Sequence, residues 1–575
     1  MKDTGHQLGN YCNCICRDDW KTHYIHLKLE NALLITLQCT LSMTSMTAKL
    51  TQTLGAPSNL WKYFGELSSI PRASKQEHRV IDWLRAFVAA RPGLTMRSDA
   101  VGNAVITRGG VNCAAGTPPV IIQGHLDMVT QKTPSSTHDF AVDPIRLRTN
   151  GGWLKATETT LGADNGIGVA AALALLDSSD DSITMPPLEC LFTVDEETGL
   201  TGAKSLDVVA LELTAKTLIN LDTEEWGCLY VGCAGGGQAI TTLPLARDAV
   251  GADVASPASI STAAGSTSSA ARYVLRIGGL LGGHSGANIH EDRANALVLI
   301  ARCVVDLRAA APPGALRLVS VAGGDKHNAI PRDADAVLML PSPAAAAALA
   351  PRVAELAAEL AAEFAHDAPT LTLTLDVADA TTTATAASAL LPPLVDADAT
   401  RLLSFLRLVP VGALKQSHAL PGLVETSNSL AICNVGATSA FVTTSTRSSI
   451  AAALEDVRAK VATLAALCGG TTEMIPSYPG WAPAPASPLL ATVKACAREV
   501  LGVEPQILAI HAGLECGLLL EKLPWKTDAI SFGPTIIEAH TPEEACEIAT
   551  VEPFWNLLVL TLERLASVEA EGGRK

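Results

Sequence analysis

Side chains that can bind metal ions follow a buried strand in the run "IIQGHLDMVT", residues 121–130. The apolar residues end in a Gly, and His125 and Asp127 then stand two positions apart. Alternate residues of an extended chain share a face, so these two side chains point to the same side. Imidazole and carboxylate groups are ligands for zinc or a similar divalent ion. The spacing therefore predicts one polar, metal-competent site at the end of this strand.

Four more stretches carry residues of the same types: "LGADNGIG" with Asp164, "TVDEETG" with Asp195, Glu196 and Glu197, "NLDTEE" with Asp222, Glu224 and Glu225, and "EAHTPEE" with His540. Each one alone has an ordinary structural interpretation, because an Asp before Asn-Gly suits a turn or a helix cap and acidic pairs are usually solvated. Together they would concentrate negative charge in one crevice unless cations offset it. Two imidazoles and three carboxylates suffice for two metal ions if one carboxylate bridges them.

The elements that must position these residues alternate between strand and helix. Strands are predicted at 101–107, 120–123, 188–194 and 216–222, and a helix at 166–178. This order is typical of an α/β domain with a mixed, mostly parallel sheet, in which ligands bind at the carboxyl ends of the strands. The same pattern returns near the C-terminus, with a helix at 488–502, strands at 506–511 and 528–534, and a closing helix. We therefore expect this first domain to be interrupted.

The interruption has a different pattern. Strands and helices are predicted in the order βαββαβ, a ferredoxin-like unit, at 272–280, 294–310, 315–324, 333–341, 343–364 and 371–378. Two further strands and a helix, at 423–435, 439–447 and 449–469, resemble a second, partial copy. Two low-complexity tracts, 251–271 and 376–400, have too little bulky apolar content to fold alone and are interpreted as surface insertions. We expect an apparently doubled α+β lid domain.

Length and composition set the wider limits. The chain has 575 residues, which is more than one core usually supports. The composition of residues 1–47 is foreign to the Ala-rich remainder. We expect a disordered extension there, with a weak targeting segment or a misassigned start upstream of Met46 as the alternatives. The catalytic domain is expected in two parts, at 48–236 and 477–575, with the lid domain at 237–476.

Charge and cysteine usage exclude several classes of protein. The net charge of −16 and the lack of a basic patch or aromatic platform argue against a nucleic-acid partner. The sequence contains no stretch of 18 uninterrupted apolar residues, which is the length that would predict a membrane span. Fourteen cysteines at irregular spacings form no disulfide framework, which favours a reducing compartment and a cytoplasmic location.

A set of longer strings makes a family resemblance specific. They are "QGHLDMV", "TTLGADNGIG", "DEETGLTGA", "NLDTEEWGCLYVGCAGG", "GGHSGANIH", "NAIPR", "YPGW", "IHAGLECG" and "SFGPTI" followed by "AHTPEE". In this order they resemble the aminoacyl-histidine dipeptidases, the Xaa-His or peptidase D group of cocatalytic zinc metallopeptidases. The resemblance covers roughly residues 50–570. It implies a di-zinc catalytic domain that is interrupted by a lid domain.

The resemblance also implies a ligand set for two Zn²⁺ ions per chain. Asp164 would bridge both ions. His125 and Asp222 would complete the set of one ion, and Glu197 and His540 that of the other. Manganese or cobalt can also occupy such a site.

Roles beyond ligation follow from the same resemblance. Asp127 would hydrogen-bond the imidazole of His125 and fix its tautomer. Glu196, next to a ligand, would be the general base. It would take a proton from the water that becomes the metal-bridging hydroxide, and would return this proton to the leaving amine. His284 of "GGHSG" would reach from the lid to stabilise the oxyanion. The catalytic residues expected are therefore Glu196, Asp127 and His284.

Three further residues are expected to contact the substrate. Asn328 in "HNAIPR" and Arg447 in "TTSTRSS" are candidates for binding its C-terminal carboxylate, and Arg suits this by its bidentate geometry. Around Arg447 the chain departs from the family pattern. Glu515 in "HAGLECG" would lie near the metals, where relatives use it for substrate contacts.

Several functions stay open at this point. The first is a metal-dependent dipeptidase for short unblocked dipeptides, with Xaa-His as one expected preference. The second is an N-acyl-amino-acid deacylase or a carboxypeptidase of the same di-zinc chemistry. The third is an inactive metal-binding scaffold, which would predict loss of a ligand or of the base. Relatives are often dimers, so a homodimer is one expected assembly.

Overall fold

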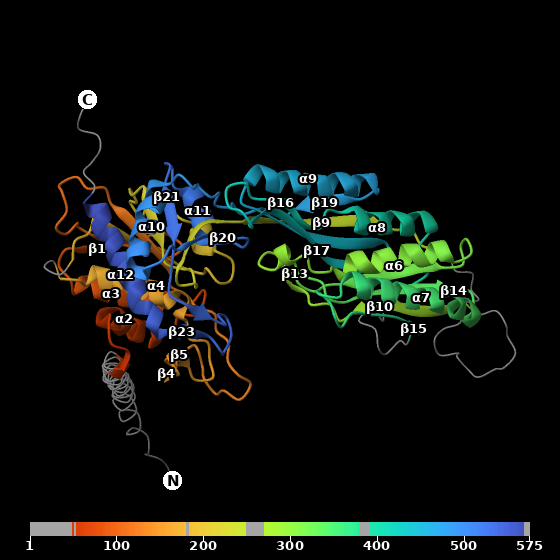
Figure 1. Ribbon diagram of the computed structural model, residues 1–575, viewed down its shortest axis with the longest axis horizontal. Helices are drawn as coiled ribbons and strands as arrows, with labels where there is room; N and C mark the ends of the chain where they lie inside the picture. Colours follow the sequence, from red (N-terminus) through yellow and green to blue (C-terminus); the bar gives the residue numbers. More distant parts are fainter. Residues whose placement is uncertain (1–48, 51–52, 180–182, 249–269, 379–390, 568–575) are drawn as a thin grey trace, which may run out of the picture. The chain divides into compact units, whose positions relative to one another are not determined.

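The computed structural model describes residues 49–50, 53–179, 183–248, 270–378 and 391–567. The extension expected at 1–47 lies outside the described residues, as do 251–269 and 379–390 of the two low-complexity tracts. The interpretation of 376–400 as a surface insertion is wrong for its last residues, because Leu394 and Ala399 are buried and a helix begins at Asp396. The described chain divides into two compact units (Figure 1). Unit 1 takes the described residues up to Gly227, Thr492–Glu504, and those from Ser531 onward; unit 2 takes Cys228–Ala491 and Pro505–Ile530. The domain limits expected at 236/237 and 476/477 stay a prediction.

Unit 1 is built on a mixed sheet. Its strands lie side by side in the order β1 (Leu94–Ser98), β2 (Ala104–Arg108), β6 (Leu188–Thr193), β3 (Val120–His125) and β7 (Thr217–Asn220). β2 pairs antiparallel with β1 and β6, whereas β3 pairs parallel with β6 and β7. Every residue of β3 and β6 is buried, as expected for strands covered on both faces. The carboxyl ends of β3, β6 and β7 therefore meet at one edge.

Helices surround this sheet: α2 (Ser58–Ser68), α3 (His78–Ala89), α4 (Ala163–Leu176), α5 (Thr201–Lys204), α10 (Pro488–Leu501) and α12 (Ile548–Ala566). α4 is apolar on all sides and almost wholly buried, which is typical of a helix inside a core. In Figure 1 the blue C-terminal helix α12 lies among the red and orange N-terminal helices. The predicted α/β class is confirmed, and the C-terminal segment completes unit 1.

Two boundaries differ from the sequence-based expectation for local reasons. The strand predicted at 101–107 begins at Ala104, because Asp99 Oδ1 accepts hydrogen bonds from the N–H groups of residues 101–103 and holds them in a turn. The strand β1 before that turn was not predicted. None of its residues is fully buried, so it lacks the apolar run that marks β3 and β6.

A small antiparallel sheet ties the C-terminal segment to the first part of unit 1. Its strands are β22 (Ile536–Ile537), β23 (Ala545–Glu547), β5 (Trp153–Ala156) and β4 (Leu147–Asn150), in that order. These strands are too short for a clear sequence pattern, and we did not predict them. The loop between β22 and β23 carries His540 and Glu544.

Unit 2 contains a nine-stranded sheet. One edge follows the predicted βαββαβ order in β10 (Ala271–Gly278), α6 (Ala296–Ala310), β12 (Arg317–Gly323), β14 (Ala334–Leu340), α7 (Pro343–Glu363) and β15 (Thr372–Val377). These strands lie side by side as β15-β10-β14-β12, all antiparallel. This is the fourth-first-third-second strand order of a ferredoxin-like unit.

The rest of that sheet repeats the plan. Its elements are β9 (Gly235–Pro244), α8 (Asp396–Leu408), β17 (Val424–Val435), β18 (Ser439–Ser448), α9 (Ala451–Leu467) and β19 (Thr471–Met474), with β16 (Gly412–Gln416) paired to β17. The strand order β19-β9-β18-β17 is again fourth-first-third-second. The first copy is inserted between β9 and α8 of the second, and the copies join at β12 and β17. One apolar core lies under both copies.

The remaining elements of the described chain are short: β8 (Cys228–Cys233), β11 (Gly283–His284), β13 (Ala329–Ile330), β20 (Gln506–Ile510), α11 (Glu515–Lys522), β21 (Asp528–Ser531) and a 3₁₀ turn at Ile289–Glu291. All ten cysteines in the described residues are free thiols. Among the helices that the structure describes, none has the length and apolar character that a membrane crossing requires.

Candidate metal centre

Three parallel strands deliver polar side chains to one edge of the unit 1 sheet. His125 is the last residue of β3, and Asp127 follows it by two positions. Glu196 and Glu197 come just after β6, and Asp222 comes just after β7. Because these strands run in the same direction, their ends meet, as the sequence predicted.

Two more residues come from outside these strands. Asp164 stands at the start of α4, two positions after Gly162, whose φ of 68° is left-handed. A cis peptide bond joins Asp164 to Asn165. His540 lies in the loop between β22 and β23, more than 370 positions later in the sequence. The small four-stranded sheet brings this loop back to the start of α4.

Asp164 lies between the two imidazoles. Its Oδ1 is 2.9 Å from His125 Nε2, and its Oδ2 is 3.2 Å from His540 Nε2. Asp222 Oδ1 is 3.4 Å from the same nitrogen of His125, and Glu197 Oε2 is 3.0 Å from the same nitrogen of His540. One carboxylate thus offers a different oxygen to each of two clusters.

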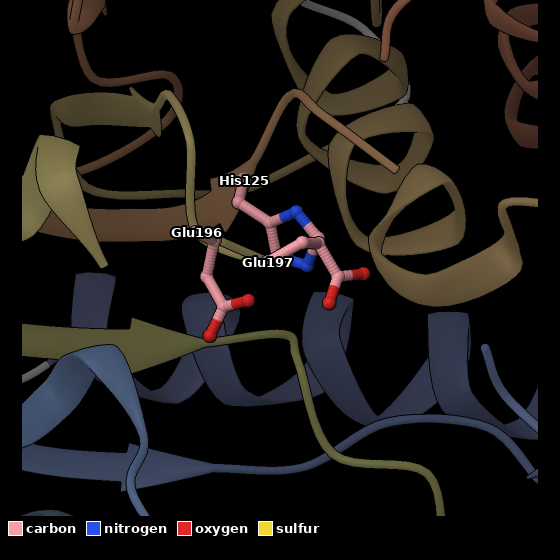
Figure 2. A group of neighbouring side chains, drawn as sticks. All are labelled: His125, Glu196 and Glu197. Carbon is pink, nitrogen blue, oxygen red and sulfur yellow. The ribbon is translucent and has the colours of Figure 1, made fainter. Parts of the chain in front are cut away.

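Ligand atoms within 4.8 Å of one another form three groups in the described residues. The first is His125, Asp164 and Asp222, and the second is Asp164, Glu197 and His540. These are the two sets that the family resemblance implied, and Asp164 belongs to both. The third is His125, Glu196 and Glu197; Figure 2 shows the two glutamate side chains next to the imidazole.

Two buried carboxylate oxygens test whether a cation fits these groups. Glu197 Oε1 is buried and has no hydrogen-bond partner among the described residues, and the buried Asp222 Oδ1 has only the distant contact with His125 Nε2 at 3.4 Å. Buried polar atoms without a partner are rare and need an explanation. A divalent cation that prefers oxygen and imidazole ligands would explain these oxygens, because they would be its ligands. The residues present are therefore suited to bind a metal ion.

The electrostatics point the same way. Hydrogen bonds to Asp164 and Glu197 raise the pKa of His540 to about 11. Burial lowers the pKa of His125, but Asp222, Asp127 and Asp164 outweigh it and leave that pKa well above its usual range. Burial, with the charges of Asp164 and Glu197, raises the pKa of Asp222 to about 7. In the metal-free protein, protonated imidazoles are the positive charges that offset this acidic cluster.

Asp127 holds the neighbouring loop and lies beside the imidazole of His125. It is fully buried, and its Oδ1 lies 3.4 Å from His125 Nδ1, an ion-pair distance at which the expected hydrogen bond is not formed. It accepts hydrogen bonds from the N–H groups of Glu196 at 3.0 Å and Glu197 at 3.2 Å, and from Ser74 Oγ at 2.8 Å. Burial would raise the pKa of Asp127, but His125 and these donors lower it to about 2. Asp127 therefore links His125 to the loop that carries Glu196 and Glu197.

Sequence reasoning missed the segment 72–77, which forms hydrogen bonds with the loops that contain Asp127, Gly162 and Asp195. Arg72 Nη1 donates to the carbonyl of Asp127 at 2.7 Å, and the N–H of Asp195 donates to Glu77 Oε1 at 2.9 Å. Burial lowers the pKa of the Arg72 guanidinium below its usual range, against the charges of Asp127 and Glu544. A lone Arg after Pro in "SIPRASKQE" shows no periodicity that could have indicated this role.

Glu544 was also missed, although the quoted string "AHTPEE" contains it. It is 2% exposed, and its carboxylate accepts hydrogen bonds from the backbone N–H groups of Leu161 and Ala163, where α4 begins. Burial raises the pKa of Glu544, and the hydrogen bonds from Gly162 and Leu161 oppose this rise. Adjacent acidic residues are usually solvated, so the pair Glu543–Glu544 gave no signal that one of them is buried.

The other predicted site residues belong to unit 2. His284 Nδ1 accepts a hydrogen bond from the N–H of Ala287 at 2.9 Å. Arg447 Nη2, which can only donate, lies 3.3 Å from His284 Nε2. Burial and the charge of Arg447 lower the pKa of His284 to about 4, so the imidazole is neutral at pH 7.

Arg447 is buried, and its Nη1 donates to Tyr478 Oη at 3.2 Å. Asn328 is exposed; its backbone carbonyl accepts the N–H of Ser285 at 2.8 Å, beside the β11–β13 pair. Glu515 is fully buried as the first residue of α11. Within unit 2, the structure thus brings His284 and Arg447 into contact. The substrate-binding roles of Asn328, Arg447 and Glu515 stay predictions.

Comparison with known proteins agrees with this geometry. The sequence model of Peptidase family M20/M25/M40 matches residues 121–564. Over 513 residues the chain is 35% identical to the cytosol non-specific dipeptidase of Escherichia coli (strain K12), across 89% of this chain and 98% of that protein. The crystal structure of aminoacylhistidine dipeptidase from Vibrio alginolyticus is similar, with a TM-score of 0.76 and 34% identity over 89% of this chain and 98% of that one.

Proposed function

Because the chain belongs to peptidase family M20/M25/M40, we propose that it is a zinc-dependent dipeptidase that hydrolyses short unblocked dipeptides, Xaa-His among them. The names of the two relatives, a non-specific dipeptidase and an aminoacylhistidine dipeptidase, support the substrate class. The cytosolic name of the Escherichia coli protein and the ten free thiols support action in the cytoplasm. A homodimer is the assembly that we propose.

The observation that carries this proposal is the position of Asp164. Its two oxygens face two different imidazoles, and each oxygen belongs to a separate group of three metal-competent residues. We propose that His125, Asp164 and Asp222 hold one Zn²⁺, and that Asp164, Glu197 and His540 hold the other. Mn²⁺ or Co²⁺ could replace zinc at such a ligand set.

Bound zinc would supply a Lewis acid and lower the pKa of water from about 15.7 towards 7. The chain's own residues do the remaining work. Glu196 takes a proton from the attacking water and passes it to the leaving amine, which general acid-base catalysis requires. Asp127 accepts a hydrogen bond from the N–H of Glu196 and lies 3.4 Å from His125 Nδ1, so it keeps the base beside the ligand set.

Unit 2 would supply the groups that recognise the substrate. We propose that His284, neutral at pH 7, stabilises the oxyanion, and a donor in that role is typically worth about 10²–10³ in rate. Arg447 would bind the C-terminal carboxylate through its guanidinium. Asn328 and Glu515 are proposed as further substrate contacts.

The test is a hydrolysis assay of the purified full chain on Xaa-His dipeptides, other dipeptides and N-acetyl amino acids, before and after chelation. We expect turnover of dipeptides that chelation abolishes and added zinc restores. Turnover of N-acetyl amino acids without dipeptide turnover would show a deacylase instead. Zinc binding without turnover of any substrate in the panel would indicate an inactive scaffold.

A further inference from the structure

Glu544 fixes the backbone in front of Asp164. Its Oε2 accepts the N–H groups of Leu161 at 2.7 Å and Gly162 at 3.0 Å. Its Oε1 accepts the N–H groups of Ala163 at 2.8 Å and of Asp164 at 3.4 Å. Both oxygens accept from N–H groups, which is the geometry of an ionised carboxylate. One buried side chain thus holds four successive peptide groups, and the last belongs to Asp164 itself.

Arg72 holds the same segment through its carbonyl groups. Its Nη2 donates to the carbonyl of Gly162 at 2.5 Å. Its Nη1 donates to the carbonyls of Leu126 at 3.0 Å and Asp127 at 2.7 Å, in the loop that follows His125. Arg72 is only 2% exposed. The guanidinium therefore links the backbone around one proposed ligand, His125, to the backbone around another, Asp164.

Gly162 is the point where these two groups meet. Glu544 binds its N–H and Arg72 binds its carbonyl, so groups of opposite charge hold the residue from both sides. Its φ of 68° is the left-handed conformation that Gly adopts without strain. A Cβ at this position would lie 2.6 Å from Arg72 Nη2 and 2.8 Å from Met128 Sδ. The loop is shaped around the guanidinium and leaves no room for a side chain.

We propose that Arg72 and Glu544 are positioning residues that hold Asp164 with its two oxygens directed at the two imidazoles, and that they thereby set the affinity of the metal centre. The inference rests on the proposed function, because it assumes that Asp164 is the bridging ligand. Neither residue is in a ligand group of the described chain. Residues that orient a metal ligand typically contribute about 10–100-fold to metal affinity or activity.

The chemistry of the two side chains makes the proposal specific. Gln at position 544 would keep one acceptor oxygen but would turn an NH₂ group towards two backbone N–H donors. Lys at position 72 would keep the charge but lose the fork that reaches two loops at once. Glu544→Gln preserves the size of the side chain but removes its charge, whereas Arg72→Lys keeps the charge, so a loss common to both variants reports the hold on the backbone.

Competition with a chromophoric zinc chelator tests the proposal on the full chain, without reference to turnover. Glu544→Gln should weaken zinc binding by about 10–100-fold relative to wild type. Glu543→Gln is the matched control, because Glu543 is the neighbouring residue, is exposed, and pairs with Lys155 at 2.9 Å. The control should bind zinc with an unchanged dissociation constant. If Glu544→Gln does not fold, Arg72→Lys is tested in the same way. The same loss of zinc affinity is expected for that variant.

A purely structural role gives a different result. It would lower the unfolding temperature of the metal-free protein but leave the zinc dissociation constant and the visible spectrum of the Co²⁺-loaded protein as in wild type. That result would overturn the positioning role. Wild type that binds no zinc would overturn the proposed metal centre as well, so the two failures can be told apart. Weaker zinc binding with an altered Co²⁺ spectrum supports the proposal.

Discussion

At the residue scale, the two neighbouring glutamates for which we propose different tasks have different surroundings. Glu197 Oε2 lies 3.0 Å from His540 and its other oxygen is buried without a hydrogen-bond partner in the described chain, as suits a metal ligand. Glu196 is outside the two groups that share Asp164 and lies beside His125 in Figure 2. A carboxylate that lies next to the proposed ligands but in neither of these two groups suits the proposed role of moving a proton.

Replacement of Glu196 separates catalysis from metal binding. Glu196→Ala should lower kcat by about 10²–10⁴-fold, the usual contribution of a general base, and should leave the zinc content unchanged. Steady-state kinetics and elemental analysis of the same preparation measure both quantities. Full activity in the metal-loaded variant would refute the assignment of the base.

The pH dependence of zinc binding follows from the imidazoles. The pKa of His540 is raised to about 11 and that of His125 lies well above its usual range, so both are protonated at pH 7 without metal. Zinc needs neutral imidazoles, so its binding must release one proton from each. The affinity for each zinc ion should therefore rise about 10-fold per pH unit near neutrality, because each ligand set contains one imidazole, and the product of the two binding constants should rise about 100-fold.

Titration calorimetry in two buffers with different ionisation enthalpies counts these protons directly. Because Asp222 has a pKa of about 7, its proton adds to the release as the pH falls below neutrality. Zinc binding that releases no protons at pH 7 would contradict the proposed ligands.

The ligand types were predictable because each proposed ligand stands in a short polar string at the end of a strand or in a recognisable motif. Arg72 and Glu544 were not predictable, because their partners are backbone groups rather than other side chains. The N–H of Leu161 and the carboxylate of Glu544 are 383 positions apart in the sequence. No local pattern reports a contact of that kind.

At the scale of elements, the parallel arrangement of β3, β6 and β7 brings the site together. Their apolar runs predicted them correctly, since buried strands need continuous apolar sequence. The strands β4, β5, β22 and β23 span only two to four residues each and were missed. That small sheet nevertheless places the loop with His540, so an element without a sequence signal positions one of the proposed ligands.

The loop before α4 can be tested with a pair of glycines. Gly162→Ala should destabilise the protein by about 1–2 kcal/mol or more, because a left-handed φ is strained for Ala and the Cβ would clash with Arg72. It should also weaken zinc binding, because the clash displaces the residues in front of Asp164.

Gly151→Ala is the matched control for strain alone. Gly151 has a φ of 57°, and nothing lies within 4 Å of an added Cβ. Gly151→Ala should cost about 1–2 kcal/mol in chemical denaturation, from the strain alone, and should leave the zinc dissociation constant unchanged. Equal zinc affinity in both variants would show that the loop shape does not control the metal centre.

At the scale of the whole molecule, the chain has two units with different tasks. The proposed metal ligands and the base all belong to unit 1, whereas His284 and Arg447 belong to unit 2. The interruption was predictable, because the α/β pattern stops and then returns near residue 488. The nesting of one ferredoxin-like copy between β9 and α8 of the other was not, because β9 and α8 are separated in sequence by the whole first copy.

Zinc content of the whole chain tests the central claim most directly. Elemental analysis of the full-length protein, after zinc loading and removal of free metal, should find two zinc ions per wild-type chain. Asp164→Ala should lose both, since a bridging carboxylate serves the two ions at once. A wild-type chain that holds one ion or none, or an Asp164→Ala chain that still holds two, would contradict the account.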